Sequence, residues 1–442
     1  MHTKKLLALF MGLSLLLSAQ CGVREKAPER VLVAPGGQQQ NADSYNPSIS
    51  GDGHYVVFQS RASDLVSDDT NGWDDVFVYE LETGQTTRVS VASDGTQGNG
   101  ASVEASISAD GSRVAFGSRA NNLVGDDNNG RLDFFVHERQ TSQTTYASVA
   151  AGGIKGDDIF YILSISGNGR YLVFQSNASN LVKKDTNKRE DAFIHDLETG
   201  QTARVSVASN GRQGKDKSGF PVASYDGRYV VFDSSARNLV GGDTNAASDV
   251  FVHDRQTGQT TRVSVTTDGT QGNGHSTWPS ISGDGQYVTF VSKASNLVSG
   301  DTNGVSDVFV HDRKTGQPTR ASTASDGTQG NGGSQNPSLS FDGRYVVFWS
   351  GATNLIDGDT NGVWDIFVHD RETGETTRVS VASDGTQGND ISRFPSISAD
   401  GRYVAFESDA DNLVSGDTNG FSDIFVHDRE TGETICVSIP GE

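Results

Sequence analysis

Most of the chain consists of short alternations of apolar and polar residues separated by turn residues. Within Pro279–Asp326, residues Gln286–Ser292 alternate between two faces, which predicts a β-strand. The preceding pair Asp284–Gly285 predicts a tight hairpin turn, because such turns need residues that accept positive φ. Similar turn signals separate four segments, so we expect strands at Pro279–Ser282, Gln286–Ser292, Asp307–His311 and Pro318–Thr323.

This pattern recurs seven times at a constant interval of 58 residues. The equivalent marker positions are Tyr55, Arg113, Tyr171, Tyr229, Tyr287, Tyr345 and Tyr403. A period of this length indicates a repeat architecture in which each unit buries its faces against its neighbours. Four-stranded sheets repeated around an axis form β-propellers. The sequence therefore predicts an all-β, seven-bladed propeller over residues 30–442, with four antiparallel strands per blade. An open β-solenoid is the alternative.

The composition agrees with thin sheets rather than one large core, since only 34% of the residues are hydrophobic. Of the 21 phenylalanines, 14 fall at two repeat positions, those of Phe290 and Phe309, which predicts that they are core residues. The formal net charge of −21 argues against a nucleic-acid partner. The two cysteines, Cys21 and Cys436, provide no disulfide framework.

The N-terminal residues have the pattern of an export signal. Basic residues precede the apolar run Leu6–Leu17, so residues 1–20 are predicted to be a secretory signal peptide. Cys21 follows directly, and LLSAQC resembles a bacterial lipoprotein signal. The resemblance implies a lipidated Cys21 and a tether over residues 21–29, with ordinary cleavage nearby as the alternative. The expected location is the outer membrane, the periplasm or the cell surface, with membrane contact only through the lipid anchor.

An additional copy of a fourth strand lies near the N-terminus. Residues Arg30–Ser50 align without a gap onto Arg88–Ser108, so Arg30–Val33 corresponds to a fourth strand. Thr434–Ile439 already supplies the fourth strand of the last copy. We therefore expect Val31–Val33 to lie beside the last blade or to compete for its edge.

The repeated motif SxDGxYVxFxS, followed by DVFVxDxxTG, resembles the PD40, or WD40-like, repeat of the TolB-type propellers. The resemblance covers all seven copies and implies an exported or periplasmic interaction platform. Similar repeats also form gating domains of some serine peptidases. The sequence contains no G-x-S-x-G nucleophile elbow, so the resemblance favours a binding module over a peptidase.

The segment between the second and third predicted strands carries the spacing Asp-x-Asn-x-x-x-Asp in every copy. Oxygen-bearing residues at such intervals suit Ca²⁺, which takes roughly six to eight oxygen ligands. The segments also resemble the D-x-[DN]-x-[DN]-G-x-x-D loops of integrin-type propellers, most completely in the sixth copy. The predicted ligands are Asp69, Asn71 and Asp75; Asp301, Asn303 and Asp307; Asp357, Asp359, Asn361 and Asp365; and Asp417, Asn419 and Asp423. The alternative is that these side chains only cap turns.

Histidine recurs at one position of the predicted third strand. The residues are His137, His195, His253, His311, His369 and His427. Repeated identical residues serve identical local roles, so hydrogen bonding within the blades is predicted rather than Ser/His/Asp catalysis. No catalytic residue is assigned.

Positions that differ between copies are better candidates for function. One of them holds Asn46, Glu104, Ile162, Phe220, Trp278, Asn336 and Phe394. We expect an aromatic lip at one mouth of the channel that binds a peptide or glycan, formed by Phe220, Trp278 and Phe394 with His275 and Arg393. Packing between neighbouring links is the alternative.

Together these features predict a monomeric, non-enzymatic interaction platform at the bacterial envelope, stabilised by calcium. A glycan lyase or hydrolase with its active site at the channel mouth is one alternative. A mainly structural surface protein rigidified by calcium is another.

Overall fold

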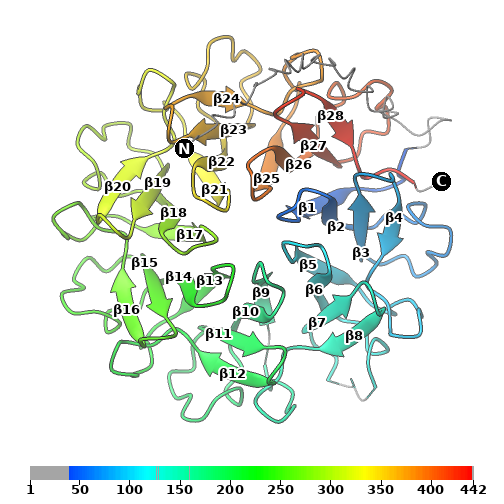
Figure 1. The fold of residues 1–442 in the computed structure, drawn as a ribbon, viewed down its shortest axis with the longest axis horizontal. Helices are drawn as coiled ribbons and strands as arrows, with labels where there is room; N and C mark the ends of the chain where they lie inside the picture. Colours follow the sequence, from blue (N-terminus) through cyan, green and yellow to red (C-terminus); the bar gives the residue numbers. More distant parts are fainter. Residues whose placement is uncertain (1–38, 126, 128, 159, 441–442) are drawn as a thin grey trace, which may run out of the picture. The chain divides into compact units, whose positions relative to one another are not determined.

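The computed structural model describes residues 39–440 except 126, 128 and 159. The predicted signal peptide, Cys21, the tether and Val31–Val33 lie outside the described residues. The described part is all β, with seven sheets of four antiparallel strands arranged around one axis (Figure 1). The prediction of a seven-bladed propeller is confirmed. No helix among the described residues is long and apolar enough to cross a membrane.

Each blade has the same strand order, from the axis outward. The innermost strands are β1 (Ser44–Ile49), β5 (Ser102–Ile107), β9 (Phe160–Ile165), β13 (Ser218–Ala223), β17 (Ser276–Ile281), β21 (Ser334–Leu339) and β25 (Ser392–Ile397). The second strands are β2 (Tyr55–Ser60), β6 (Arg113–Ser118), β10 (Tyr171–Ser176), β14 (Tyr229–Ser234), β18 (Tyr287–Ser292), β22 (Tyr345–Ser350) and β26 (Tyr403–Ser408).

The third strands are β3 (Asp75–Glu80), β7 (Asp133–Glu138), β11 (Asp191–Asp196), β15 (Asp249–Asp254), β19 (Asp307–Asp312), β23 (Asp365–Asp370) and β27 (Asp423–Asp428). The outer strands are β4 (Thr86–Arg88), β8 (Gln143–Tyr146), β12 (Gln201–Arg204), β16 (Gln259–Arg262), β20 (Gln317–Arg320), β24 (Thr376–Arg378) and β28 (Thr434–Cys436).

The fifth blade shows where the predicted strand limits differ from the structure. Strand β17 begins at Ser276, three residues before the predicted start at Pro279. The register with β18 skips Trp278 and Pro279, and Trp278 has a φ of 52°. A β-bulge accommodates a proline inside a strand because the bulged residues leave the ladder of hydrogen bonds. The sequence pattern had made Pro279 a strand boundary, whereas it is part of a bulge.

The core of each blade is a pair of stacked phenylalanines from the second and third strands. In the fifth blade Phe290 lies opposite Phe309, with ring centroids 6.1 Å apart, and both rings are fully buried. The same pair recurs in all seven blades, with centroids 5.7–6.1 Å apart. Stacked aromatic pairs bury a large apolar area in a thin sheet. The predicted core role of the two phenylalanine positions is confirmed.

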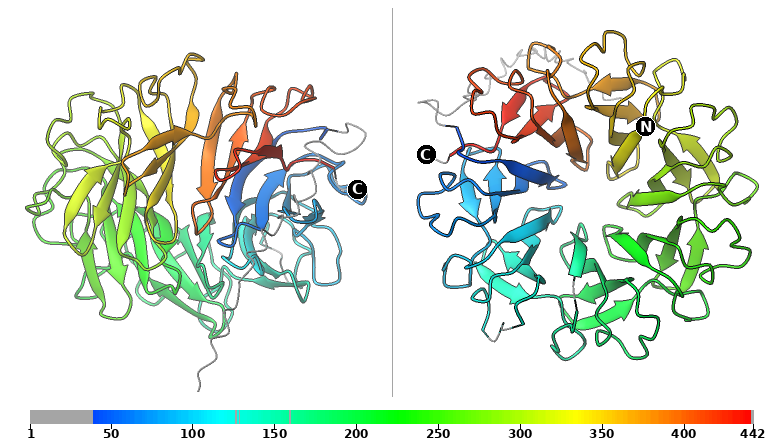
Figure 2. Two further views of the ribbon diagram at one scale, coloured as in Figure 1. Left: turned by 45° about the horizontal axis from the view of Figure 1, so that its top comes forward. Right: turned by 180° about the vertical axis from the view of Figure 1, so that it is seen from behind.

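Every described sheet consists of four strands that are consecutive in the sequence, so no blade exchanges a strand with another. Strand β1 docks on the seventh blade through the hydrogen bond from Ser44 N to Ser422 O (2.9 Å). The same contact joins later blades, as from Ser102 N to Asp74 O (2.7 Å). The first and last blades therefore meet as any other neighbouring pair does (Figure 2).

Candidate functional site

Two carboxylates, one from the loop between β22 and β23 and one at the start of β23, contact the same arginine. The Arg378 guanidinium lies 3.4 Å from Asp359 Oδ1 and 3.5 Å from Asp365 Oδ2. The Gln387 amide donates to Asp359 Oδ1 (2.8 Å), and the Asn361 amide donates to Asp365 Oδ2 (3.1 Å). Asn361 Oδ1 in turn accepts a hydrogen bond from a backbone N–H, as expected of a turn cap. The nitrogen atoms of Arg378, Gln387 and Asn361 therefore lie beside the carboxylates that were predicted to bind calcium.

The same arrangement recurs in four other blades. The arginines that contact the loop carboxylates are Arg88, Arg204, Arg262, Arg320 and Arg378. Among the described residues, no group of three or more His, Cys, Asp or Glu side chains is arranged to hold a metal ion. Asp357, the extra acidic residue of the sixth copy, is exposed. Calcium binding stays a prediction, and these five loops give it no structural support.

The second and seventh blades depart from this pattern. In the second blade Tyr146 replaces the arginine, and the cation is Lys155, whose ammonium lies 3.7 Å from Asp127. In the seventh blade Cys436 stands at the arginine position. Among the described residues, no cationic group forms an ion pair with Asp417 or Asp423.

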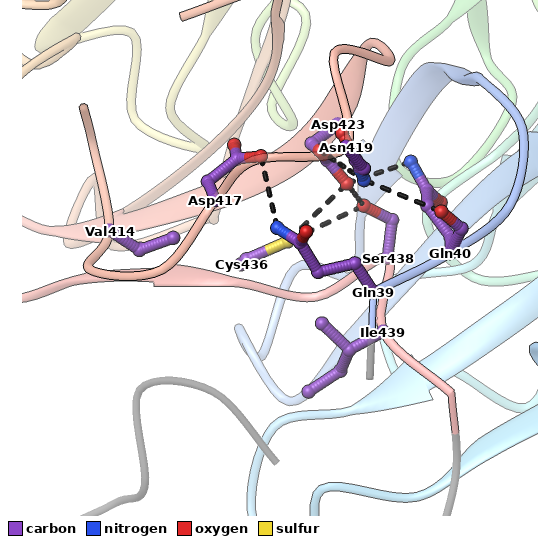
Figure 3. A pocket seen from close by; sticks show the side chains of 9 residues that line it. All are labelled: Gln39, Gln40, Val414, Asp417, Asn419, Asp423, Cys436, Ser438 and Ile439. Carbon is purple, nitrogen blue, oxygen red and sulfur yellow. Dashed lines mark hydrogen bonds between the residues drawn. The ribbon is translucent and has the colours of Figure 1, made fainter. Parts of the chain in front are cut away.

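Figure 3 shows the resulting cluster in the seventh blade, where the side chains point toward one another. Asp423 Oδ1 accepts hydrogen bonds from Ser438 Oγ (2.6 Å) and Gln40 Nε2 (2.7 Å), and Cys436 Sγ lies 3.6 Å away. Gln39 donates to Asp417 Oδ1 (3.1 Å). Burial without a cationic partner raises the pKa of Asp423 to about 7, and burial also raises the pKa of the Cys436 thiol.

The repeated histidines form hydrogen bonds that link neighbouring blades. His253 Nδ1 lies 2.9 Å from Thr260 Oγ1, which donates to the carbonyl oxygen of Val207 in the preceding blade (2.5 Å). The pattern recurs at His137, His195, His369 and His427. These bonds are the structural role that repetition predicted. In the fifth blade Pro318 replaces the threonine, and His311 Nδ1 is buried without a hydrogen-bond partner among the described residues.

The predicted aromatic lip is only partly assembled. The rings of Phe220 and Trp278 lie 6.0 Å apart, whereas Phe394 packs against Trp349 at 5.6 Å. Arg393 is bound to Glu407 (2.6 Å) and Asp409 (2.8 Å). His275 Nδ1 accepts the backbone N–H of Ser248 (3.0 Å). The structure therefore brings Phe220 and Trp278 together, while the other members pack within or between blades.

The acidic residues near this end of the ring support the bulges of the inner strands. Glu407 Oε2 accepts the backbone N–H of the bulge residue Asn46 (3.1 Å), and Asp233 Oδ2 accepts that of Trp278 (3.4 Å). Burial raises the pKa of Asp233 to about 7 and also raises that of Glu407. Each carboxylate thus has a structural role in satisfying a buried N–H group.

A different surface lies at the other end of the inner strands. The turns between the first and second strands, here called the inner turns, meet around the axis. Seven residues, here called the axial residues, occupy the same position in them: Gly51, Ala109, Gly167, Tyr225, Gly283, Phe341 and Ala399. Seven backbone hydrogen bonds of 2.8–3.0 Å join neighbouring inner turns into a closed ring. All seven blades line the open depression of about 160 Å³ at this end.

Tyr225 and Phe341 are the two aromatic residues that line this depression. Their rings lie 5.6 Å apart with an edge-to-face orientation, and they are 42% and 43% exposed. A Cβ at Gly167 would lie 2.4 Å from the Tyr225 ring, and a Cβ at Gly283 would lie 2.2 Å from the Phe341 ring. Glycine at these two positions therefore lets each aromatic ring lie across the neighbouring inner turn.

The repeated sequence itself distinguishes these two positions. In the repeated motif SxDG, the variable residue is small in five copies, but it is Tyr225 in the fourth copy and Phe341 in the sixth. The other copies hold only glycine or alanine at this position beside a tight turn, so the repeat provides no buried space for an aromatic ring. Tyr225 and Phe341 are therefore candidates for exposure.

No known protein family matches the sequence, and no curated protein matches it. The structure is similar to the β-propeller domain of the Trilobed protease from Pyrococcus furiosus. The TM-score is 0.55 at 12% identity, over 90% of this chain and 98% of that one. It is also similar to an oligogalacturonate lyase from Vibrio parahaemolyticus, with a TM-score of 0.53 at 15% identity, over 88% and 90% of the chains. At these identities the likeness establishes the propeller fold alone.

TolB from Acinetobacter baumannii aligns with a TM-score of 0.42 at 15% identity, over 78% of this chain and 65% of that one. This score is too low to support a conclusion about family or function. The assignment of the repeat to the PD40 type therefore stays a prediction.

Proposed function

We propose that the protein is a non-enzymatic interaction platform whose binding surface is the axial depression at the inner turns. One observation carries the proposal. Where the inner turns of all seven blades meet around the axis, two aromatic side chains stand exposed above a ring of small residues. Exposed aromatic side chains at an open depression are typical anchors of protein recognition.

Most of the repeated groups outside this depression have local partners, which supports a binding role over an enzymatic one. The loop carboxylates contact Arg or Lys in six blades, and five of the histidines bond to threonine. Arg393 pairs with both Glu407 and Asp409, so these unlike charged groups near the channel mouth are already held in ion pairs.

The proposal places the platform at the bacterial envelope, because residues 1–20 have the pattern of a secretory signal and Cys21 follows them. Detergent phase partitioning of the protein and of a Cys21→Ser variant, both expressed with the signal, tests this part. The natural chain is expected in the detergent phase and the variant in the aqueous phase. Equal partitioning of both would remove the lipid anchor from the proposal.

Selection from a random peptide library displayed on phage tests the binding surface. Peptides enriched on the natural protein are expected to lose at least about tenfold in affinity for a Tyr225→Ala/Phe341→Ala variant. Trp73→Ala is the matched control, because Trp73 is 52% exposed in the loop between β2 and β3. Peptides that lose affinity for the control and keep it for the double variant would show that the axial depression is not the binding surface.

A further inference from the structure

We propose that the axial depression recognises a lysine- or arginine-bearing segment of a partner protein. This inference rests on the proposed function and adds the chemistry of the partner. Its first basis is position. In six of the seven inner turns an exposed aspartate directly follows the axial residue: Asp52, Asp110, Asp226, Asp284, Asp342 and Asp400. Exposed carboxylates therefore lie in six of the seven turns whose axial residues line the depression.

Each of these carboxylates uses only one oxygen to shape its turn. Asp226 Oδ1 accepts hydrogen bonds from Ser224 Oγ and Arg228 N, both at 2.9 Å. The Oδ1 atom of Asp342 has the equivalent two bonds, at 2.7 and 2.9 Å. Within the described part of the chain, Oδ2 of Asp226, Asp284 and Asp342 accepts no hydrogen bond and takes part in no ion pair. These oxygens remain available to a ligand.

The arginines nearest to these turns are held by other partners. Arg344 makes two hydrogen bonds to Asp370, of 3.0 and 2.7 Å, and Arg228 makes the equivalent bonds to Asp254. Asp370 and Asp254 end the third strands, which lie farther from the axis than the inner turns. The guanidinium of Arg313 lies 4.0 Å from the centre of the Tyr229 ring. Arg255, Arg313 and Arg371 donate to the carbonyl oxygens of Gly227, Gly285 and Gly343 in the inner turns. These cations are thus bound to backbone oxygens, and the Oδ2 atoms of the neighbouring aspartates have no cationic partner among the described residues.

Aromatic rings and carboxylates together favour a cationic side chain over other groups. A cation over the face of an exposed aromatic ring gains about 0.5–1 kcal/mol, and the apolar stem of lysine or arginine packs on the same ring. The ring of carboxylates attracts the same charge and repels an acidic segment. A neutral apolar segment would pack on Tyr225 and Phe341 but would not be attracted by the aspartates. The test distinguishes a basic segment from a neutral one by this difference.

The test measures fluorescence anisotropy of labelled nonapeptides with the full folded protein in about 50 mM NaCl, where surface charges are weakly screened. The probe repeats Gly-Leu-Arg three times, and two matched peptides carry glutamine or glutamate in place of arginine. The arginine peptide is expected to bind at least about tenfold more tightly than the glutamine peptide. The variant Asp226→Asn/Asp284→Asn/Asp342→Asn should remove about this tenfold difference and leave binding of the glutamine peptide unchanged.

The matched control is Asp94→Asn/Asp268→Asn/Asp326→Asn. These aspartates are exposed, each accepts a backbone N–H in a tight turn, and the net charge changes by the same amount. An equal loss in the control would mean that overall charge, not the axial site, binds the peptide, and would overturn the inference.

Equal binding of the arginine and glutamine peptides, lost in Tyr225→Ala/Phe341→Ala, would overturn the basic partner and leave the proposed surface standing. Binding that is unaffected by Tyr225→Ala/Phe341→Ala would overturn both. Absence of binding by every peptide would overturn the inference alone, because the proposed surface is tested separately by the display selection.

Discussion

Replacing Cys436 with arginine should stabilise the protein. Cys436 stands where five blades carry an arginine, which in four of them contacts both loop carboxylates, and β28 pairs with β27 as the equivalent strands pair in those blades. The side chain of Cys436→Arg should therefore reach Asp417 and Asp423. It would supply the positive charge that this cluster lacks.

The magnitude follows from the pKa of Asp423. Burial raises this pKa from 3.8 to about 7, so keeping the carboxylate ionised in the folded state costs about 4 kcal/mol above pH 7. Between pH 4 and 7 the unfolded chain is ionised and the folded chain is protonated, so stability falls as pH rises. In the sixth blade burial still raises the pKa of Asp365 although Arg378 lowers it, so arginine offsets only part of this cost. We expect a gain of about 1–3 kcal/mol at pH 8.

Thermal unfolding at several pH values measures this effect. For a chain of this size, the expected gain corresponds to a rise in Tm of about 1–4 °C at pH 8. The rise should be much smaller at pH 5, where Asp423 is protonated in the folded state of the natural protein. Cys436→Met is the matched control, because it fills space without adding charge. The reasoning would be refuted if both variants raised Tm equally, or if the effect of arginine did not depend on pH.

Four further perturbations follow from the same contacts. Arg378→Ala leaves Asp359 and Asp365 buried without a cation, so urea unfolding should show a loss of about 2–4 kcal/mol; a loss below about 0.5 kcal/mol would contradict the ion-pair role. Millimolar calcium should leave Tm within about 1 °C of its value in EGTA, because an arginine lies beside the loop carboxylates in five blades; a larger rise that Asp359→Ala reduces would support calcium binding instead. Pro318→Thr gives His311 the partner it lacks and should add about 1 kcal/mol, whereas Pro318→Val should add none. Gly283→Ala should displace the Phe341 ring and weaken peptide binding, whereas Gly241→Ala, which meets open space, should not; equal binding by both would contradict the predicted displacement.

The repeat made the fold predictable from the sequence. A constant interval with identical turn signals fixes the number of blades, and the alternation around Phe290 and Phe309 fixes which positions are buried. The start of β17 was placed wrongly because Pro279 reads as a boundary. Pro279 lies in a bulge that is supported by a tertiary contact: the backbone N–H of Trp278 donates a hydrogen bond to Asp233 of the neighbouring blade.

The loop chemistry was less predictable, because spacing along the chain shows only part of each cluster. Asp359, Asn361 and Asp365 have the spacing of a calcium loop, but their partners Arg378 and Gln387 come from the outer strand and the following link. A pattern search confined to one loop does not include them. The repeated sequence nevertheless indicates this partner, because an arginine recurs at the same distance along the chain from the loop in five copies.

The location of the exposed surface depends on which end of the inner strands is hollowed. The sequence showed variable aromatics at Phe220, Trp278 and Phe394, and the structure packs them in part against other rings. Tyr225 and Phe341 come from different blades, and only the closed ring of inner turns brings them together.

Photocrosslinking tests the central claim, that the binding surface is the axial depression, most directly. A display-selected peptide carrying a benzophenone would be irradiated with the natural protein, and the modified residues would be located by mass spectrometry. The account predicts crosslinks concentrated on the inner turns, at and beside Tyr225, Gly283 and Phe341, that disappear with unlabelled peptide in excess. Competed crosslinks confined to the outer strands, or to the loop that carries Trp73, would contradict it.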